Sequence, residues 1–203
     1  MSDFEQNLEK YAELAVRVAV NVQPGQTLVV NAPISAAEFV RLIVKKAYEV
    51  GSKYVKVIWS DEAVTRLYYE LAPDESFSIP PKWHAEEMTE LVEQGAAVLH
   101  VIADNPDLLA GIKQDRITTA QRAKATAMAK YRAYQQADKF SWSIVAVPSE
   151  AWAEKIFPDL PAEERIHTLW ETIFKMVRVD QPEPVTAWQA HMDNLQSKSD
   201  ILN

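Results

Sequence analysis

The sequence contains no cysteine and only four glycines among its 203 residues, and both shortages exclude functions. Without a thiol, the chain can form no disulfide, no cysteine nucleophile and no thiolate metal site. The glycines stand far apart, at positions 25, 51, 95 and 111, so a glycine-rich phosphate loop and a dinucleotide fingerprint are both missing. The Gly-x-Ser-x-Gly pattern of a serine-hydrolase elbow does not occur either. The familiar nucleotide and serine-hydrolase motifs are therefore absent.

Positive charge and long apolar runs are also scarce. The chain has 21 Lys and Arg against 29 Asp and Glu, a net charge of −8, whereas a nucleic-acid binder needs a basic face to neutralise phosphates. The most continuous apolar stretch, residues 96–103, is strand-sized and far short of the roughly 20 residues that cross a bilayer. The first residues are acidic where a signal peptide would be basic. We predict a cytoplasmic protein that binds neither nucleic acid nor membrane.

Short β-branched segments alternate with amphipathic segments along most of the chain. Apolar segments that suit buried parallel strands are residues 27–31, 53–59, 97–103 and 141–147. Segments with helical periodicity are residues 4–20, 35–50, 61–71, 84–94 and 115–136, and after residue 149 only helices follow, at 150–156, 162–177 and 185–201. This order predicts an α/β fold with an open, mainly parallel sheet of about four or five strands, helices on both faces and a helical carboxyl-terminal segment.

Several residues carry helix-start signals. Ser35 and Glu38 have the spacing of a capping box, Asp61 is placed to cap the next helix, and Asn105 with Pro106 resembles an N-cap followed by a first helical residue. The helix expected over 115–136 is basic in an acidic protein, which favours a solvated face or docking on an acidic surface. Its alanine and tyrosine stripe indicates core packing.

The histidines give no metal motif, because their separations exclude a pair one turn apart on a helix. His100 and Asp104 share one face of a strand, and such a pair can hold a metal, although a core histidine is the commoner interpretation. Polar residues also collect where the expected strands end, which is the ligand-binding edge of open α/β sheets. These residues are Asn31, Ser60, Asp61, Asp104, Asn105 and Ser149. Each can equally be a helix N-cap, and we keep both interpretations.

The segment Ser141-Trp-Ser-Ile-Val-Ala-Val-Pro-Ser-Glu-Ala-Trp152 and its continuation to Pro158 resemble the thermophilic metallo-aminopeptidase family, the group of aminopeptidase T and aminopeptidase S. Further matches follow in the order of that family. They are Val57-Ile-Trp-Ser-Asp61, Ala103-Asp-Asn-Pro-Asp-Leu-Leu-Ala-Gly111, Leu169-Trp-Glu-Thr-Ile173 and Pro184-Val-Thr-Ala-Trp188 with His191. The combination covers nearly the whole chain, although no single piece is specific.

The resemblance implies a protein of two domains, with a two-metal site of Glu, His, Asp and Tyr ligands in its carboxyl-terminal half. Residues 1–203 would then be the amino-terminal α/β domain, with the catalytic domain absent and no catalytic or metal-binding residue of its own. The last expected helix still runs at residue 200 without a glycine cap, so we expect a chain that is cut rather than finished.

By the same resemblance, the intact enzyme would remove amino-terminal residues from peptides with two divalent ions, zinc or cobalt, and would form a homodimer around an enclosed cavity. Within this chain we expect Trp59, Asp61, Asp104 and Asn105 to line that cavity or to face the second domain. The alternative is a stand-alone α/β module that binds a ligand or another protein.

Overall fold

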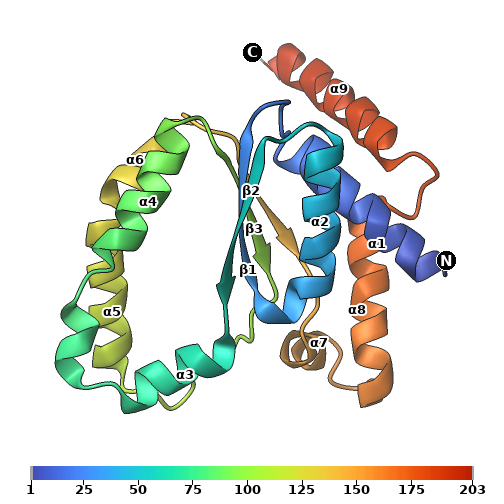
Figure 1. The fold of residues 1–203 in the computed structure, drawn as a ribbon. Coiled ribbons are helices and arrows are strands. Elements are labelled where there is room, and N and C mark those ends of the chain that lie inside the picture. The colour runs from blue at the N-terminus through green and yellow to red at the C-terminus, as the bar shows by residue number, and fades with distance from the viewer. Residues whose placement is uncertain (1, 203) are drawn as a thin grey trace.

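The computed structural model describes residues 2–202, and its centre is a sheet of four parallel strands in the order β2-β1-β3-β4 (Figure 1). The strands are β1 (Thr27–Pro33), β2 (Tyr54–Ser60), β3 (Ala97–Ile102) and β4 (Trp142–Ala146). All three neighbouring pairs are parallel, so every strand ends at the same edge of the sheet. This arrangement confirms the predicted fold class, with four strands.

One face of the sheet carries a buried apolar core. It is covered by α1 (Asp3–Leu14), the π-helical turn η1 (Ala15–Ala19), α2 (Ala37–Glu49) and α8 (Ala162–Met176), which lie together on one side in Figure 1. Leu28, Val30 and Leu99 point to this side and have no exposed surface. Ser2 begins α1 with a capping box to Glu5, which fixes where the first helix starts.

The opposite face is covered by α4 (Lys82–Glu93), α5 (Gln114–Ala127) and α6 (Ala129–Gln136), on the left of Figure 1. A smaller core joins this layer to the sheet, in which Val29 and Val98 pack with Met88 of α4 and Tyr131 of α6. These contacts lie toward the strand starts, because Val29 and Val98 precede the polar residues Asn31 and His100 on the same face.

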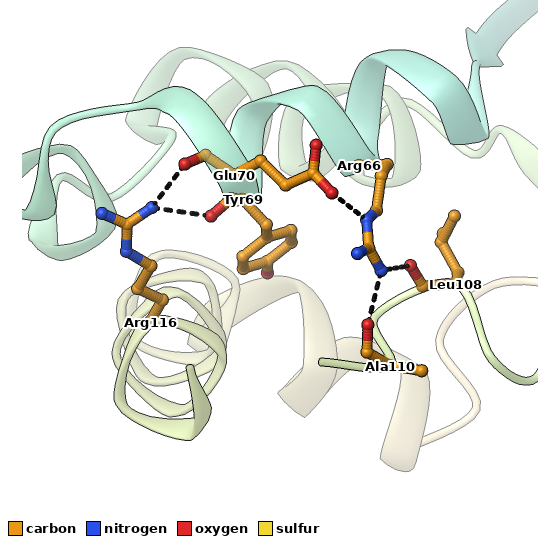
Figure 2. Close-up of polar contacts among 6 residues, drawn as sticks. All are labelled: Arg66, Tyr69, Glu70, Leu108, Ala110 and Arg116. Carbon is orange, nitrogen blue, oxygen red and sulfur yellow. Dashed lines mark hydrogen bonds and ion pairs between the residues drawn. The ribbon is translucent and has the colours of Figure 1, made fainter. Parts of the chain in front are cut away.

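An outer bridge joins the strand ends to α5. It consists of α3 (Glu62–Leu71) and the 3-10 segment η3 (Asp74–Ser78), against which α5 packs. Figure 2 shows the two arginines that hold it. Arg116 Nη1 of α5 donates to the carbonyls of Tyr69 and Glu70 at 2.8 and 3.0 Å. Arg66 Nη1 of α3 donates to the carbonyls of Leu108 and Ala110 at 2.9 and 2.7 Å, and so ties the loop after β3 to the bridge.

Two helix-start predictions are wrong. Ser35 caps no helix, because the residues Ile34–Ala36 form a 3-10 turn and α2 begins beyond them at Ala37. Asn105 begins no helix either: its side-chain oxygen accepts the N–H of Asp107 at 2.9 Å in a turn. The carbonyls of Leu108 and Ala110, which a helix would use internally, are held by Arg66 instead.

The other helices agree with the sequence pattern, with one break. Asp61 and Ser149 cap α3 and α7 (Glu150–Ile156) as expected. The expected helix over 115–136 is divided at the buried Met128 into α5 and α6. Val185 falls in the last helix, α9 (Pro184–Leu202), as predicted. None of the helices in residues 2–202 combines the length and the apolar character needed to span a membrane.

Candidate functional site

The order of the strands creates a switch point between β1 and β3. The helix that follows β1, α2, covers one face, whereas α4, which precedes β3, covers the other. In open α/β sheets, ligands bind outside the carboxyl ends of the strands at such a point. Asn31 and His100 are register partners across this junction and lie on the α4–α6 face. The fold therefore places a polar pair where a ligand site is expected.

A cavity of about 610 Å³ opens at this junction, and we call it the switch-point cavity. The sheet supplies its floor, and α4, α5 and α6 supply its wall. The lining residues that matter below are Asn31, Trp59, His84, His100, Asp104, Lys124, Met128, Tyr131, Arg132 and Gln135. Its volume falls within the range of roughly 300–1,000 Å³ that small-molecule sites occupy.

Two buried polar atoms beside this cavity have no hydrogen-bond partner among the described residues. They are Asn31 Nδ2 and the Tyr131 hydroxyl oxygen. A buried donor left without a partner costs about 1–3 kcal/mol. Tyr131 is 5% exposed, and burial raises its pKa to about 12, so the hydroxyl remains a proton donor at neutral pH. The interior of the site therefore contains two donors that the chain itself does not satisfy.

The wall of the cavity is positively charged. Lys124 and Arg132 are exposed and have no ion-pair partner in the described part of the chain, whereas the nearby Lys130 is paired with Glu93 at 2.6 Å. Burial lowers the pKa of His84 and of His100, and the charge of Lys124 lowers both further. Asp104 is the acidic residue among those that line the cavity. Cationic side chains thus outnumber acidic ones in the lining of the cavity.

The structure separates the four residues predicted for the site. Trp59 and Asp104 line the switch-point cavity. Asp61 does not line it, because its carboxylate accepts the N–H groups of Ala63 and Val64 at the start of α3. Asn105 is held in its turn, and its own N–H donates to the Glu62 carboxylate at 2.8 Å. The role of these four residues toward substrate or a second domain stays a prediction.

Sequence reasoning missed the contribution of the helical wall. Lys124, Met128, Tyr131, Arg132 and Gln135 all line the cavity, at intervals of four, three, one and three residues that fall on one side of a helix. The sequence pattern predicts a solvated basic face for Lys124 and Arg132 and core packing for Tyr131, and it assigns no role to Met128 or Gln135. The helical spacing was a usable signal, although it does not reveal which strand ends the helix faces.

The described residues do not fit a metal centre. Residues 2–202 contain no group of three or more His, Cys, Asp or Glu side chains arranged to hold an ion. His100 and Asp104 line the same cavity, but two ligands do not make a dinuclear site.

A second concave surface lies on the other face, beside β4. We call it the apolar groove, and its volume is about 570 Å³. Its walls come from η1, β4, α8 and α9, and its apolar lining includes Val18, Ile144, Trp152, Met176, Trp188 and Met192. Three of these residues are largely open to solvent: Ile144 is 53%, Met176 74% and Met192 51% exposed. Ile144 lies on the edge strand β4 in register with His100, so it also lines the switch-point cavity on the opposite face.

The chain is similar to a known protein family along nearly its whole length. The model of the thermophilic metalloprotease family (M29) matches residues 4–203. The chain is 51% identical over 203 residues to Aminopeptidase 2 of Geobacillus stearothermophilus and to Aminopeptidase AmpS of Bacillus subtilis, which are covered over 49% and 50% of their lengths. The solved structure of wild-type AmpT from Thermus thermophilus superimposes with a TM-score of 0.85 at 38% identity, over 93% of this chain and 46% of that chain. The chain spans about half the length of the curated relatives it matches.

Proposed function

Because the chain belongs to the thermophilic metalloprotease family M29, we propose that it is the amino-terminal domain of a two-domain aminopeptidase. The observation that carries this proposal is the coverage: the relatives align with the whole of this chain and with only half of themselves. The lack of a metal-ligand group within residues 2–202 supports it, because a metalloprotease then needs ligands from elsewhere. In this proposal the catalytic domain supplies all metal ligands, and the present domain has none.

The apolar groove is the surface that we assign to the contact with the catalytic domain. Large apolar side chains such as Met176 and Ile144 rarely stay exposed together on a protein surface without a partner. The last helix, α9, supports the same assignment. It is anchored by Trp188 Nε1, which donates to the Val177 carbonyl at 2.7 Å. Beyond this anchor, every described side chain from Met192 to Ile201 is exposed. Such a helix gains little stability from packing unless another domain covers it.

The switch-point cavity is the surface that we assign to substrate. Its lining includes Trp59 and Asp104, and we propose that it forms part of an enclosed space that admits short peptides. Asp61 and Asn105 shape the same edge through α3 and the adjoining turn. The intact protein in this proposal is a cytoplasmic homodimer with two divalent ions, zinc or cobalt, in its catalytic domains.

The test compares residues 1–203 with the protein extended through its second half. We expect the extended protein to release amino acids from aminoacyl p-nitroanilides with added zinc or cobalt, and the shorter chain to show no turnover while unfolding cooperatively in urea. Metal-dependent turnover by the pure shorter chain that disappears in its His100→Gln variant would overturn the proposal. A stop codon directly after Asn203 in the gene would favour the alternative, a stand-alone ligand-binding or interaction module.

A further inference from the structure

The switch-point cavity has an excess of positive charge that the chain does not neutralise. Three of the seven arginines and lysines in the outer bridge and the α4–α6 layer have an ion-pair partner: Arg66 pairs with Glu70 at 2.5 Å, Arg116 with Asp74 at 2.6 Å and Lys130 with Glu93. Lys82 and Arg122 have no ion-pair partner among the described residues, but neither lines the cavity. Lys124 and Arg132 have none in the described residues, although both line the cavity. An anionic ligand would form ion pairs with these two side chains, because unpaired cations beside a cavity raise the local concentration of anions.

The floor of the same cavity supplies neutral donors. Asn31 Nδ2 is without a partner, and rotation about the terminal torsion of this side chain, which is broad in asparagine, turns the amide toward the cavity. His100 lies beside Asn31 in the neighbouring strand, and its lowered pKa keeps the ring neutral at pH 7, with one N–H to donate. The ligand therefore meets charged donors on the wall and neutral donors on the floor.

We propose that the switch-point cavity binds the free carboxylate of a short peptide or an amino acid, between Lys124 and Arg132 on the wall and Asn31 on the floor. Arginine and lysine both make charge-assisted hydrogen bonds to a carboxylate. A multiply charged phosphate is the poorer match, because Asp104 lines the same cavity and no glycine-rich phosphate loop adjoins it. The choice of a peptide as the source of the carboxylate rests on the proposed function.

The experiment measures binding to residues 1–203 by titration calorimetry and by shifts of backbone amide resonances. Triglycine and triglycinamide are the probes, since they differ in the charge of one end. We expect triglycine to bind about tenfold more tightly or better, because hydrogen bonds to charged groups are the stronger ones. The resonances of residues 31, 100, 124 and 132 should shift with triglycine. Binding of glycine, acetate and inorganic phosphate is measured in the same way, to distinguish an amino acid, a simple carboxylate and a phosphate as the source of the anionic group.

Variants locate the site. Lys124→Gln and Arg132→Gln should each remove most of the preference for triglycine over triglycinamide. Arg122→Gln is the matched control, because Arg122 is exposed on α5 and does not line the cavity. Asp104→Asn should leave triglycine binding unchanged or tighten it, since a negative charge is removed from beside the carboxylate.

Two results overturn the inference. Equal binding of triglycine and triglycinamide would exclude a carboxylate site, and tighter binding of phosphate than of triglycine would make the cavity a phosphate site. Both results are binding measurements on residues 1–203 alone, which do not involve turnover. They would therefore not contradict the assignment of the chain to an aminopeptidase. Conversely, an extended protein that binds triglycine through Arg132 but releases no amino acid would reject the assignment and keep the carboxylate site.

Discussion

The two faces of the sheet use the same strands for different purposes. Toward α1, α2 and α8, alternate positions such as Leu28, Val30 and Leu99 are fully buried to the end of the strand. Toward α4–α6, only Val29 and Val98 are buried, and the next positions along those strands are Asn31 and His100. Apolar burial therefore stabilises one whole face and only the first half of the other, whose second half is left for a polar cavity.

The helices on the two faces are also held in different ways. On the packed face, α2 contributes Phe39, Val40 and Ile43 to the core. On the cavity face, α5 has no fully buried side chain and is fixed by Arg116 to backbone carbonyls of the bridge. A wall held by hydrogen bonds can stand off from the sheet, whereas a helix held by apolar contacts must lie on it. The cavity therefore adjoins a helix, α5, that is held by hydrogen bonds, whereas α4 and α6 in the same layer pack on the sheet through Met88 and Tyr131.

The largest test of this contrast removes one isoleucine from each face. Ile43→Ala deletes a side chain with no exposed surface in the packed core, and we expect the free energy of unfolding to fall by about 2–5 kcal/mol. Ile144→Ala removes the same atoms from a residue that is 53% exposed, and we expect a loss below about 1 kcal/mol. Urea unfolding of both variants measures the difference. Equal losses would mean that the two faces are packed alike.

A medium effect is expected at the bridge. Arg116→Met removes the donors to the carbonyls of Tyr69 and Glu70 together with the ion pair to Asp74, and we expect a loss of about 1–3 kcal/mol. Its effect should be local: hydrogen exchange should accelerate in α3 and η3 while α2 keeps its protection. Arg122→Met on the same helix is the control and should change neither. Loss of protection in α2 would show that the bridge supports the packed face as well.

The alternation of strands and helices could be predicted because buried parallel strands and amphipathic helices have distinct local patterns. The two wrong helix starts have causes that a local sequence pattern does not contain. Asn105 fails as a cap because Arg66, which precedes Leu108 by 42 residues, occupies the carbonyls that follow Asn105. Ser35 fails because the chain makes a 3-10 turn as it leaves β1. Long-range contacts and strand-end geometry decide both.

The candidate site was predictable in part for the same reason. The rule that ligands bind at strand ends selects Trp59 and Asp104, which line one cavity of the structure, because strand ends follow from local pattern; their role toward a substrate or a second domain stays a prediction. Asp61 was equally eligible, but its carboxylate is used by α3. Lys124, Tyr131 and Arg132 could not be placed, because the face of α5 and α6 that turns toward the sheet depends on the break at Met128 and on the bridge.

The smallest expected effect is the change of stability with pH that comes from His100, which lies in the polar half of the cavity face and has no histidine counterpart among the described core residues of the packed face. Burial and the charge of Lys124 hold its pKa below the ordinary value of 6.5, so on acidification the unfolded chain takes up a proton before the folded chain does. Stability should therefore be level above pH 6.5 and should fall as the pH drops below it, down to the lowered pKa. His84 acts with the same sign, facing Lys124, Glu87 and Lys56.

Urea unfolding between pH 7.5 and about 5.5 measures this slope while most carboxylates stay ionised. His100→Gln should make it shallower and leave the contribution of His84, because glutamine keeps a donor in the cavity but takes up no proton. His167→Gln is the control, since His167 is exposed on α8, beside Glu171 and away from the cavity. If the slope is the same in His100→Gln as in the parent chain, burial in the cavity is not what resists the proton. The polar half of this face would then be as open to water as the outer surface, and the contrast between the two faces would be one of packing alone.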